Sequence, residues 1–157
     1  MASDAVERFR RSAQERGLRI EVREFPAGTR TAKDAAAAIG CEVAQIVKSL
    51  VFMAGDEPVL ALTSGRNRVD EDKLAAAIGG TEVRKADADE VRAATGYAIG
   101  GTPPFGHDTR LTIVCDQDLV GFDEVWAAAG TPSTVFGLTP EQLLIATDAR
   151  VVDLSAR

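Results

Sequence analysis

Hydrophobic and polar positions in the first third of the chain predict two helices around one strand. Residues 5–16 are polar and amphipathic at helical spacing, and residues 18–25 then alternate between apolar and charged, as expected of a half-buried strand. The alanine-rich residues 32–39 predict a second helix, which Gly40 would end. Residues 42–46 predict a short helical turn that leads into the next strand.

The middle of the chain contains two apolar runs that predict a hairpin of buried strands. They cover residues 49–54 and 58–63, and the turn-forming residues 55–57 separate them. A third helix is expected over residues 70–78, because the acidic residues in its first turn suit the positive end of the helix dipole. Residues 81–85 predict a short strand.

The last part of the chain continues to alternate short helices and strands. The expected helices are a brief one that ends at Ala94, one over residues 123–129 with the only tryptophan, and one over residues 140–146. The expected strands cover residues 111–115, 134–138 and 151–154.

This order of elements gives about seven strands and roughly six short helices, with no linker and no internal repeat. We therefore expect a mixed α/β (α+β) fold in which a strongly curved, barrel-like mixed sheet is flanked by short helices. Residues 1–157 are long enough to bury a core of their own, so we expect a single compact domain.

Composition and charge limit the class of protein, its cellular compartment and the partners that it can bind. The sequence is 45% hydrophobic and 27% charged, as in ordinary folded proteins. No run approaches the roughly 20 apolar residues of a membrane span, and the charged start lacks a signal core, so we expect a cytoplasmic protein. The net charge of −6 argues against broad nucleic-acid binding, which draws its affinity from many Lys and Arg contacts to phosphate.

The residue sets of common hydrolytic sites are missing. One histidine, His107, cannot form a two-histidine metal site, and neither a Gly-x-Ser-x-Gly nor a His-Glu-x-x-His motif occurs. Cys41 and Cys115 belong to no Cys-x-x-Cys pair, so we expect core thiols and no metal or other cofactor. We expect His107 to be a surface residue, although its place beside a glycine-rich loop leaves contact with a substrate or assistance to water open.

Lys48 is the first candidate for chemistry. It follows residues 45–47 and precedes the apolar run 49–54, which would place its ammonium group at the mouth of a buried sheet. A charge in a low-dielectric site is costly unless it is paired. Such a lysine either extends to water or meets an anionic ligand, and the residues alone leave both interpretations open.

The glycine-proline loop over residues 100–106 is the second candidate. Its glycines allow backbone amides to approach a ligand closely, and its prolines make the turn rigid. The loop is therefore either an oxyanion-binding site or a tight connection between two strands.

Taken together, these segments resemble the YbaK/prolyl-tRNA synthetase-associated family. The resemblance is carried by residues 45–50 (QIVKSL), residues 96–106 (GYAIGGTPPFG) and the C-terminal segment from residues 143–144 to 151–154, in that order. The helix after Thr31 and the intervening residues 72–74 agree with it, so it covers nearly the whole chain.

The resemblance implies a compact α/β domain that hydrolyses the ester of mischarged tRNA, either inserted in bacterial prolyl-tRNA synthetases or free-standing. The chain is similar to the free-standing kind, which implies a trans-acting deacylase for tRNA(Pro) carrying Cys or Ala. Its expected partners are the mischarged acceptor end and, as a second candidate, an aminoacyl-tRNA synthetase. The alternative is a non-catalytic module that binds the acceptor stem or a synthetase, and the oligomeric state is not predicted.

The resemblance also implies roles for individual residues. Lys48 matches the critical lysine of the family, which lies near the terminal adenosine and its phosphate, and Gly100, Gly101 and Thr102 would donate hydrogen bonds to the developing oxyanion. Water or a group of the substrate itself, a ribose hydroxyl or a thiol, would attack. The expected substrate-binding residues are Thr31, Ser49, Pro103, Pro104, Phe105, Gly106, Thr134 and Val135, and the expected tRNA-binding residues are Arg30, Lys33, Arg66 and Arg68.

The choice of amino acid stays open at this point. Cysteine-selective members of the family tend to carry an aromatic residue near the position of Thr31 and an aspartate near that of Val135, and this chain has neither. A small, weakly polar pocket around Thr31, Val135 and Phe136 would accept Ala, Cys or Ser, because a pocket discriminates one methylene group by only ~1–3 kcal/mol.

Overall fold

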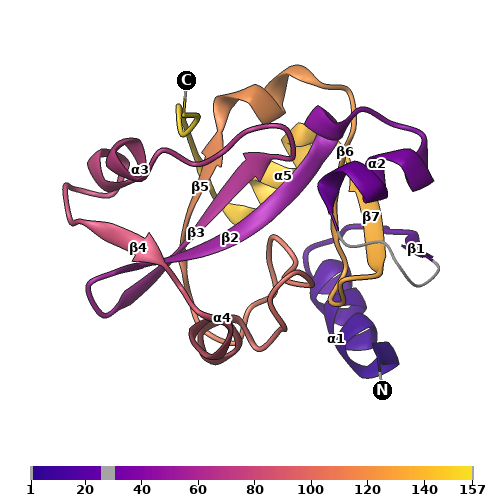
Figure 1. The fold of residues 1–157 in the computed structure, drawn as a ribbon. Helices are drawn as coiled ribbons and strands as arrows, with labels where there is room; N and C mark the ends of the chain where they lie inside the picture. Colours follow the sequence, from indigo (N-terminus) through magenta and orange to yellow (C-terminus); the bar gives the residue numbers. More distant parts are fainter. Residues whose placement is uncertain (1, 26–30, 157) are drawn as a thin grey trace.

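The fold is described by a computed structural model that covers residues 2–25 and 31–156. Five α-helices accompany eight strands in this part of the chain (Figure 1). The helices are α1 (Ala2–Glu15), α2 (Ala32–Ile39), α3 (Glu71–Ala77), α4 (Ala88–Thr95) and α5 (Pro140–Thr147). The strands are β1 (Val22–Glu24), β2 (Ile46–Ala54), β3 (Glu57–Ser64), β4 (Val83–Lys85), β5 (Thr112–Asp116), β6 (Val125–Ala128), β7 (Thr134–Leu138) and β8 (Arg150–Val152).

The strands form one mixed sheet in the order β1-β7-β6-β2-β3-β5-β8, and β4 pairs with β2 outside this path. β2 is antiparallel to β3 and β4 but parallel to β6, while β5 is parallel to both β3 and β8. Figure 1 shows the long β2–β3 hairpin crossing the molecule with α5 behind it. The mixed α/β fold is confirmed, but the sheet has eight strands rather than seven and does not close into a barrel.

Side chains of β2 enter two cores, one on each face of the sheet. Val47 and Val51 belong to the larger core with Phe9 of α1 and Phe136 of β7. Phe52 belongs to a smaller core, against which Leu50 also packs. Successive residues of a strand point to opposite faces, so the apolar run of β2 is buried on both sides of the sheet.

The helix predicted over residues 123–129 is wrong, because this segment contains strand β6. Val125 and Ala127 are buried, whereas Trp126 and Ala128 between and after them are half-buried, which is the period of a strand. β6 pairs with β7 on one edge and with β2 on the other. Pairing in the sheet therefore outweighs the helix propensity of the three alanines, residues 127–129.

Several helix boundaries follow from local capping. Thr31 accepts a hydrogen bond from the backbone of Asp34 and begins α2, and Gly40 ends it in the left-handed conformation. Thr139 caps α5, whose first residue is Pro140. The strands differ more from expectation: the one predicted over residues 18–25 is reduced to β1, and β2 begins at Ile46 rather than at residue 49.

Candidate active site

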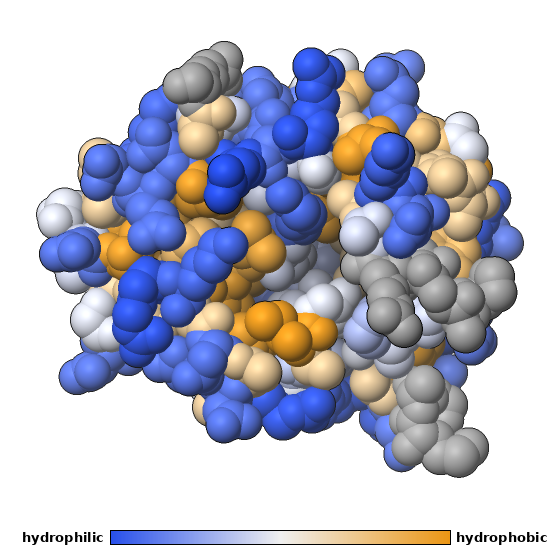
Figure 2. All heavy atoms as spheres, viewed as in Figure 1, coloured by the Kyte–Doolittle hydropathy of each residue, from blue (hydrophilic) through white to orange (hydrophobic). Residues whose placement is uncertain are grey.

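A cavity of about 340 Å³ lies where one edge of β2 has no neighbouring strand. β6 pairs with β2 only at Ile46 and Val47, and the pairing with β4 begins at Phe52. Residues 48–51 between these two points line the cavity. Figure 2 shows the hollow near the centre of this face, with hydrophilic side chains around much of it. The gap in the sheet thus creates the site.

The described lining of the cavity is cationic and contains no acidic group. The charged residues that line it are Lys48 and Lys85, and its described lining includes no Asp or Glu. Much of the remaining surface is apolar, with alanines from α2 and β6 and the half-buried ring of Trp126. This composition suits a ligand with a phosphate group at one end and a small uncharged group at the other.

Lys48 is the third residue of β2 and therefore lies within the strand rather than just before it, because β2 begins three residues earlier than predicted. Its ammonium group is half-buried and donates to the backbone carbonyl oxygen of Asn67 at 2.7 Å. Burial lowers the pKa of Lys48 below 10.5, and the charges of Lys85 and Arg68 lower it further. In the described part of the chain no carboxylate forms an ion pair with Lys48. Its charge therefore remains available to an anion.

Asn67 is held in place by two carboxylates. Its side-chain amide donates to Asp116 at 3.1 Å and to Asp118 at 2.8 Å. Asp116 is fully buried and also accepts from the backbone of Leu154. These bonds fix the backbone carbonyl group of Asn67, which orients Lys48. They also mean that the two carboxylates bind the Asn67 amide and not the ammonium group of Lys48.

The loop at Gly100 lies on the other side of the cavity and packs tightly. The N–H of Gly101 donates to the carbonyl oxygen of Ala98 at 3.0 Å. A Cβ at Gly101 would lie 2.7 Å from the backbone of Thr131, so only glycine fits there. Gly100 and Thr102 line the cavity, and their N–H groups have no hydrogen bond among the described residues. Two amides, rather than the three expected, are thus free to donate.

Four predicted substrate-binding residues also line the cavity: Thr31, Ser49, Thr134 and Val135. Thr134 shares a 2.8 Å hydrogen bond with the hydroxyl of Thr131. The hydroxyl of Ser49 is buried and has no hydrogen-bond partner in the described structure. With Lys48, Gly100 and Thr102, the fold brings seven of the predicted residues into one site.

The second half of the loop does not line this cavity. Pro103 and Pro104 are buried, and a Cβ at Gly106 would meet the side chain of Ser12. Phe105 packs in the larger core, with its ring centroid 4.9 Å from that of Phe9. These residues support the loop from behind.

The predicted tRNA-binding residues are spread over the surface. Lys33 and Arg66 are exposed, and Arg66 lines a separate shallow depression with Asp118. Arg68 is exposed and lies close enough to affect the pKa of Lys48. Arg30 lies outside the described residues.

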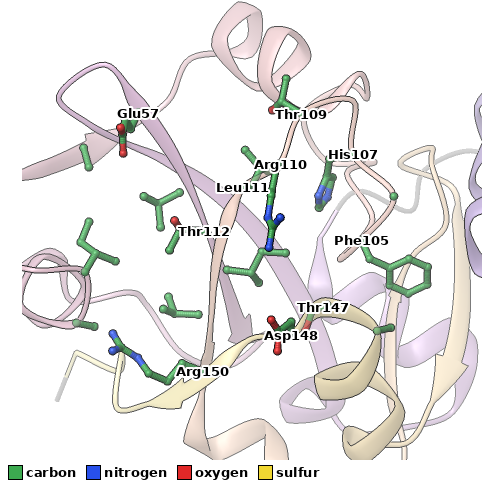
Figure 3. Close-up of a pocket in the computed structure, with 18 of the residues that line it drawn as sticks. Glu57, Phe105, His107, Thr109, Arg110, Leu111, Thr112, Thr147, Asp148 and Arg150 are labelled. Atoms are coloured by element: carbon green, nitrogen blue, oxygen red, sulfur yellow. The ribbon is translucent and has the colours of Figure 1, made fainter. Parts of the chain in front are cut away.

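His107 is half-buried rather than a surface residue. Its Nε2 atom lies 2.7 Å from the carbonyl oxygen of Pro103, and burial lowers its pKa. Because a carbonyl oxygen only accepts, Nε2 carries the proton and donates. His107 lines a second, open depression of about 1250 Å³, with Arg110 and Asp148 (Figure 3), and it does not line the Lys48 cavity.

Sequence reasoning missed Lys85 and Trp126 as lining residues. Lys85 ends a three-residue strand, and no sequence signal indicates that this strand pairs beside the open edge of β2. The three alanines that follow Trp126 favour a helix, and a helix gives no indication that Trp126 lies next to β2. The apolar residues Val125 and Ala127 on either side of Trp126 have the spacing of a strand, and this spacing is the signal that could have placed Trp126 in the sheet.

The chain matches a known protein family and is similar to several known proteins. A family model described as an aminoacyl-tRNA editing domain matches residues 26–145. A solved structure described as "a putative trans-editing enzyme for prolyl tRNA synthetase" is 48% identical, with a TM-score of 0.93, and the match covers 98% of each chain. Protein YwhH of Bacillus subtilis (strain 168), described as uncharacterized, is 34% identical over 126 residues, which are 78% of each chain.

Two further matches concern tRNA more directly. EbsC of Enterococcus faecalis (strain ATCC 700802 / V583), described as "Putative Cys-tRNA(Pro)/Cys-tRNA(Cys) deacylase", is 27% identical over 81% of this chain and 78% of EbsC. The proline–tRNA ligase of Geobacter sp. (strain M21) is 34% identical over 107 residues, and the match spans only 19% of that ligase.

None of the helices in the described part of the chain has the length and apolar character needed to cross a membrane.

Proposed function

Because the chain belongs to the aminoacyl-tRNA editing domain family and is an aminoacyl-tRNA hydrolase, we propose that it acts in trans on tRNA(Pro) that carries alanine or cysteine. The observation that carries this proposal is the cavity itself, in which the unpaired charge of Lys48 faces a loop with two free backbone amides. The names of the similar trans-editing enzyme and of EbsC support tRNA(Pro) as the carrier.

The proposed mechanism relies on positioning and electrostatics. Lys48 binds the phosphate of the terminal adenosine, because an ammonium group in a partly desolvated site interacts strongly with an anion. The N–H groups of Gly100 and Thr102 donate to the carbonyl oxygen of the ester as it becomes an oxyanion. Water attacks the carbonyl carbon, the bond to the 3′-oxygen of the ribose breaks, and that oxygen takes the proton that water gives up, so the free amino acid and the 3′-hydroxyl are released. A neighbouring ribose hydroxyl can assist by orienting this water, and with cysteine the substrate thiol can attack first and form a thiolactone that water then opens.

The walls of the cavity favour an uncharged amino-acid side chain. Ala32, Ala35 and Ala128 line it together with Val135, so no charged group is present on this part of the wall to pair with a charged side chain. Alanine and cysteine have uncharged side chains that suit such a wall. The proposal therefore predicts hydrolysis of both mischarged species, and an editing enzyme for tRNA(Pro) is expected to leave prolyl-tRNA(Pro) intact.

A panel of acylated tRNAs tests the proposal. tRNA(Pro) charged with alanine, cysteine, serine or proline, and tRNA(Ala) charged with alanine, are incubated with the protein, and the loss of ester is measured above spontaneous hydrolysis. We expect rapid loss from alanyl- and cysteinyl-tRNA(Pro) and no loss from prolyl-tRNA(Pro). If no member of the panel is hydrolysed but tRNA still binds, the chain is a non-catalytic acceptor-stem module.

A further inference from the structure

Lys85 projects from the same face of the sheet as Lys48. Lys48, Leu50 and Phe52 are alternate residues of β2 and therefore share a face. Lys85 lies directly opposite Phe52 in the antiparallel β2–β4 pair, and directly opposed residues lie on the same face. Both lysines line the cavity, so they approach it from one side of the sheet.

Arg84, which precedes Lys85 on β4, differs from it in its charge partner. Arg84 points to the opposite face and forms two hydrogen bonds with the carboxylate of Glu90, at 2.9 and 2.7 Å. Lys85 is exposed and makes no ion pair with any described residue. Two adjacent cations thus differ: the charge of Arg84 is neutralised within the protein, and the charge of Lys85 is not.

We propose that Lys85 binds the 5′-phosphate of the penultimate nucleotide of the acceptor end, one phosphate before the one that Lys48 binds. This inference rests on the proposed function. The cavity between the two lysines contains no carboxylate among its described lining residues, so neither charge has a competing partner there. A polyanion is the kind of ligand that such a pair of cations recognises.

The spacing of the lysines supports two phosphates rather than one. Lys48 lies four residues along β2 from Phe52, the residue that pairs with Lys85, or about 13 Å at roughly 3.3 Å per residue. Leu50 lies between them on the same face and lines the cavity, so it offers an apolar surface to the sugar or base between the phosphates. The acceptor strand would therefore run along the open edge of β2, with its aminoacyl end at Lys48.

Two short substrates isolate the phosphate in question. Alanine is esterified to the dinucleotide CpA or to pCpA, which differ only in the 5′-phosphate of the cytidine. For the unaltered protein we expect kcat/KM to be about fivefold higher with alanyl-pCpA. For Lys85→Gln we expect the two substrates to react at equal kcat/KM, equal to that of alanyl-CpA with the unaltered protein.

Arg84→Gln is the matched control, because it removes the same charge from the adjacent residue on the opposite face. It should retain the fivefold preference for alanyl-pCpA. With full-length alanyl-tRNA(Pro), Lys85→Gln should raise KM and leave kcat within about twofold. It should also make the plot of log(kcat/KM) against log[salt] shallower by about 0.7, the value for one lost contact to a single strand.

The outcomes separate this inference from the function on which it rests. If the unaltered protein hydrolyses neither short substrate nor alanyl-tRNA(Pro), the proposed function fails. If it hydrolyses them and Lys85→Gln keeps the preference for alanyl-pCpA, the assignment of Lys85 is overturned. An equal loss with Lys85→Gln on both short substrates also overturns it, since Lys85 would then act on a group that both contain.

Discussion

The ammonium group of Lys48 donates to the backbone carbonyl oxygen of Asn67 at 2.7 Å. A carbonyl group orients the lysine without neutralising its charge, whereas a carboxylate would do both. The carboxylates of Asp116 and Asp118 instead bind the side chain of Asn67. The position of Lys48 is thus fixed before substrate arrives, and its charge is left for a phosphate.

The affinity for tRNA should weaken at alkaline pH earlier than for an ordinary lysine. Burial first, and then Lys85 and Arg68, lower the pKa of Lys48 below 10.5, so the proton is lost as the pH rises through this lowered value. KM measured in a pH series, corrected for spontaneous hydrolysis, should therefore rise below pH 10.5. Lys48→Arg keeps its charge and should move this rise to higher pH, and a rise at the same pH in both proteins would exclude Lys48 as its source.

Gly101→Ala should damage the loop, because the added Cβ would lie 2.7 Å from the backbone of Thr131. Overpacking of this kind costs about 1–3 kcal/mol of unfolding free energy. Displacement of the neighbouring amides should also slow deacylation at least ~10-fold. Gly121→Ala is the control, since nothing lies within 4 Å of the added Cβ. Denaturant unfolding and single-turnover rates should separate the two variants, and equal behaviour would refute the role of close packing.

His107→Gln should leave deacylation within about twofold, because glutamine can still donate to the carbonyl oxygen of Pro103. The variant should change the pH dependence of stability. Burial lowers the folded-state pKa of His107 below 6.5, so the unfolded state binds the proton more readily and stability is lost as the pH falls below 6.5. Unfolding free energies measured from pH 7.5 down to 5 should fall less steeply for His107→Gln. An identical slope would show that His107 is not responsible.

Local patterns in the sequence predicted most of the elements. The β2–β3 hairpin follows from two apolar runs around a glycine turn, α2 from its alanines and the glycine after them, and α5 from the proline at its start. The segment around Trp126 favours a helix because three alanines follow it, and only pairing with β2 and β7 makes it a strand. Local propensity cannot reveal such partners, because they are far away in the sequence.

The site was predictable only in part for a related reason. Lys48 and the loop at Gly100 carry recognisable sequence patterns, and the fold places both at one cavity. Phe105 belongs to the same loop pattern, yet its ring enters the core. A loop has no fixed side-chain period from which this direction could be predicted. Lys85 carries no pattern at all, because its role arises from the register in which β4 pairs with β2.

The central claim is that the unpaired charge of Lys48 positions the acceptor end for hydrolysis. The most direct measurement is the single-turnover hydrolysis of alanyl- and cysteinyl-tRNA(Pro) by the unaltered protein, by Lys48→Ala and by Arg10→Ala, which removes an exposed charge outside the cavity. We expect Lys48→Ala to slow deacylation at least ~10²-fold with the fold intact, as for the loss of one electrostatic stabiliser, and Arg10→Ala to react at the normal rate. Equal rates for all three proteins would contradict the claim.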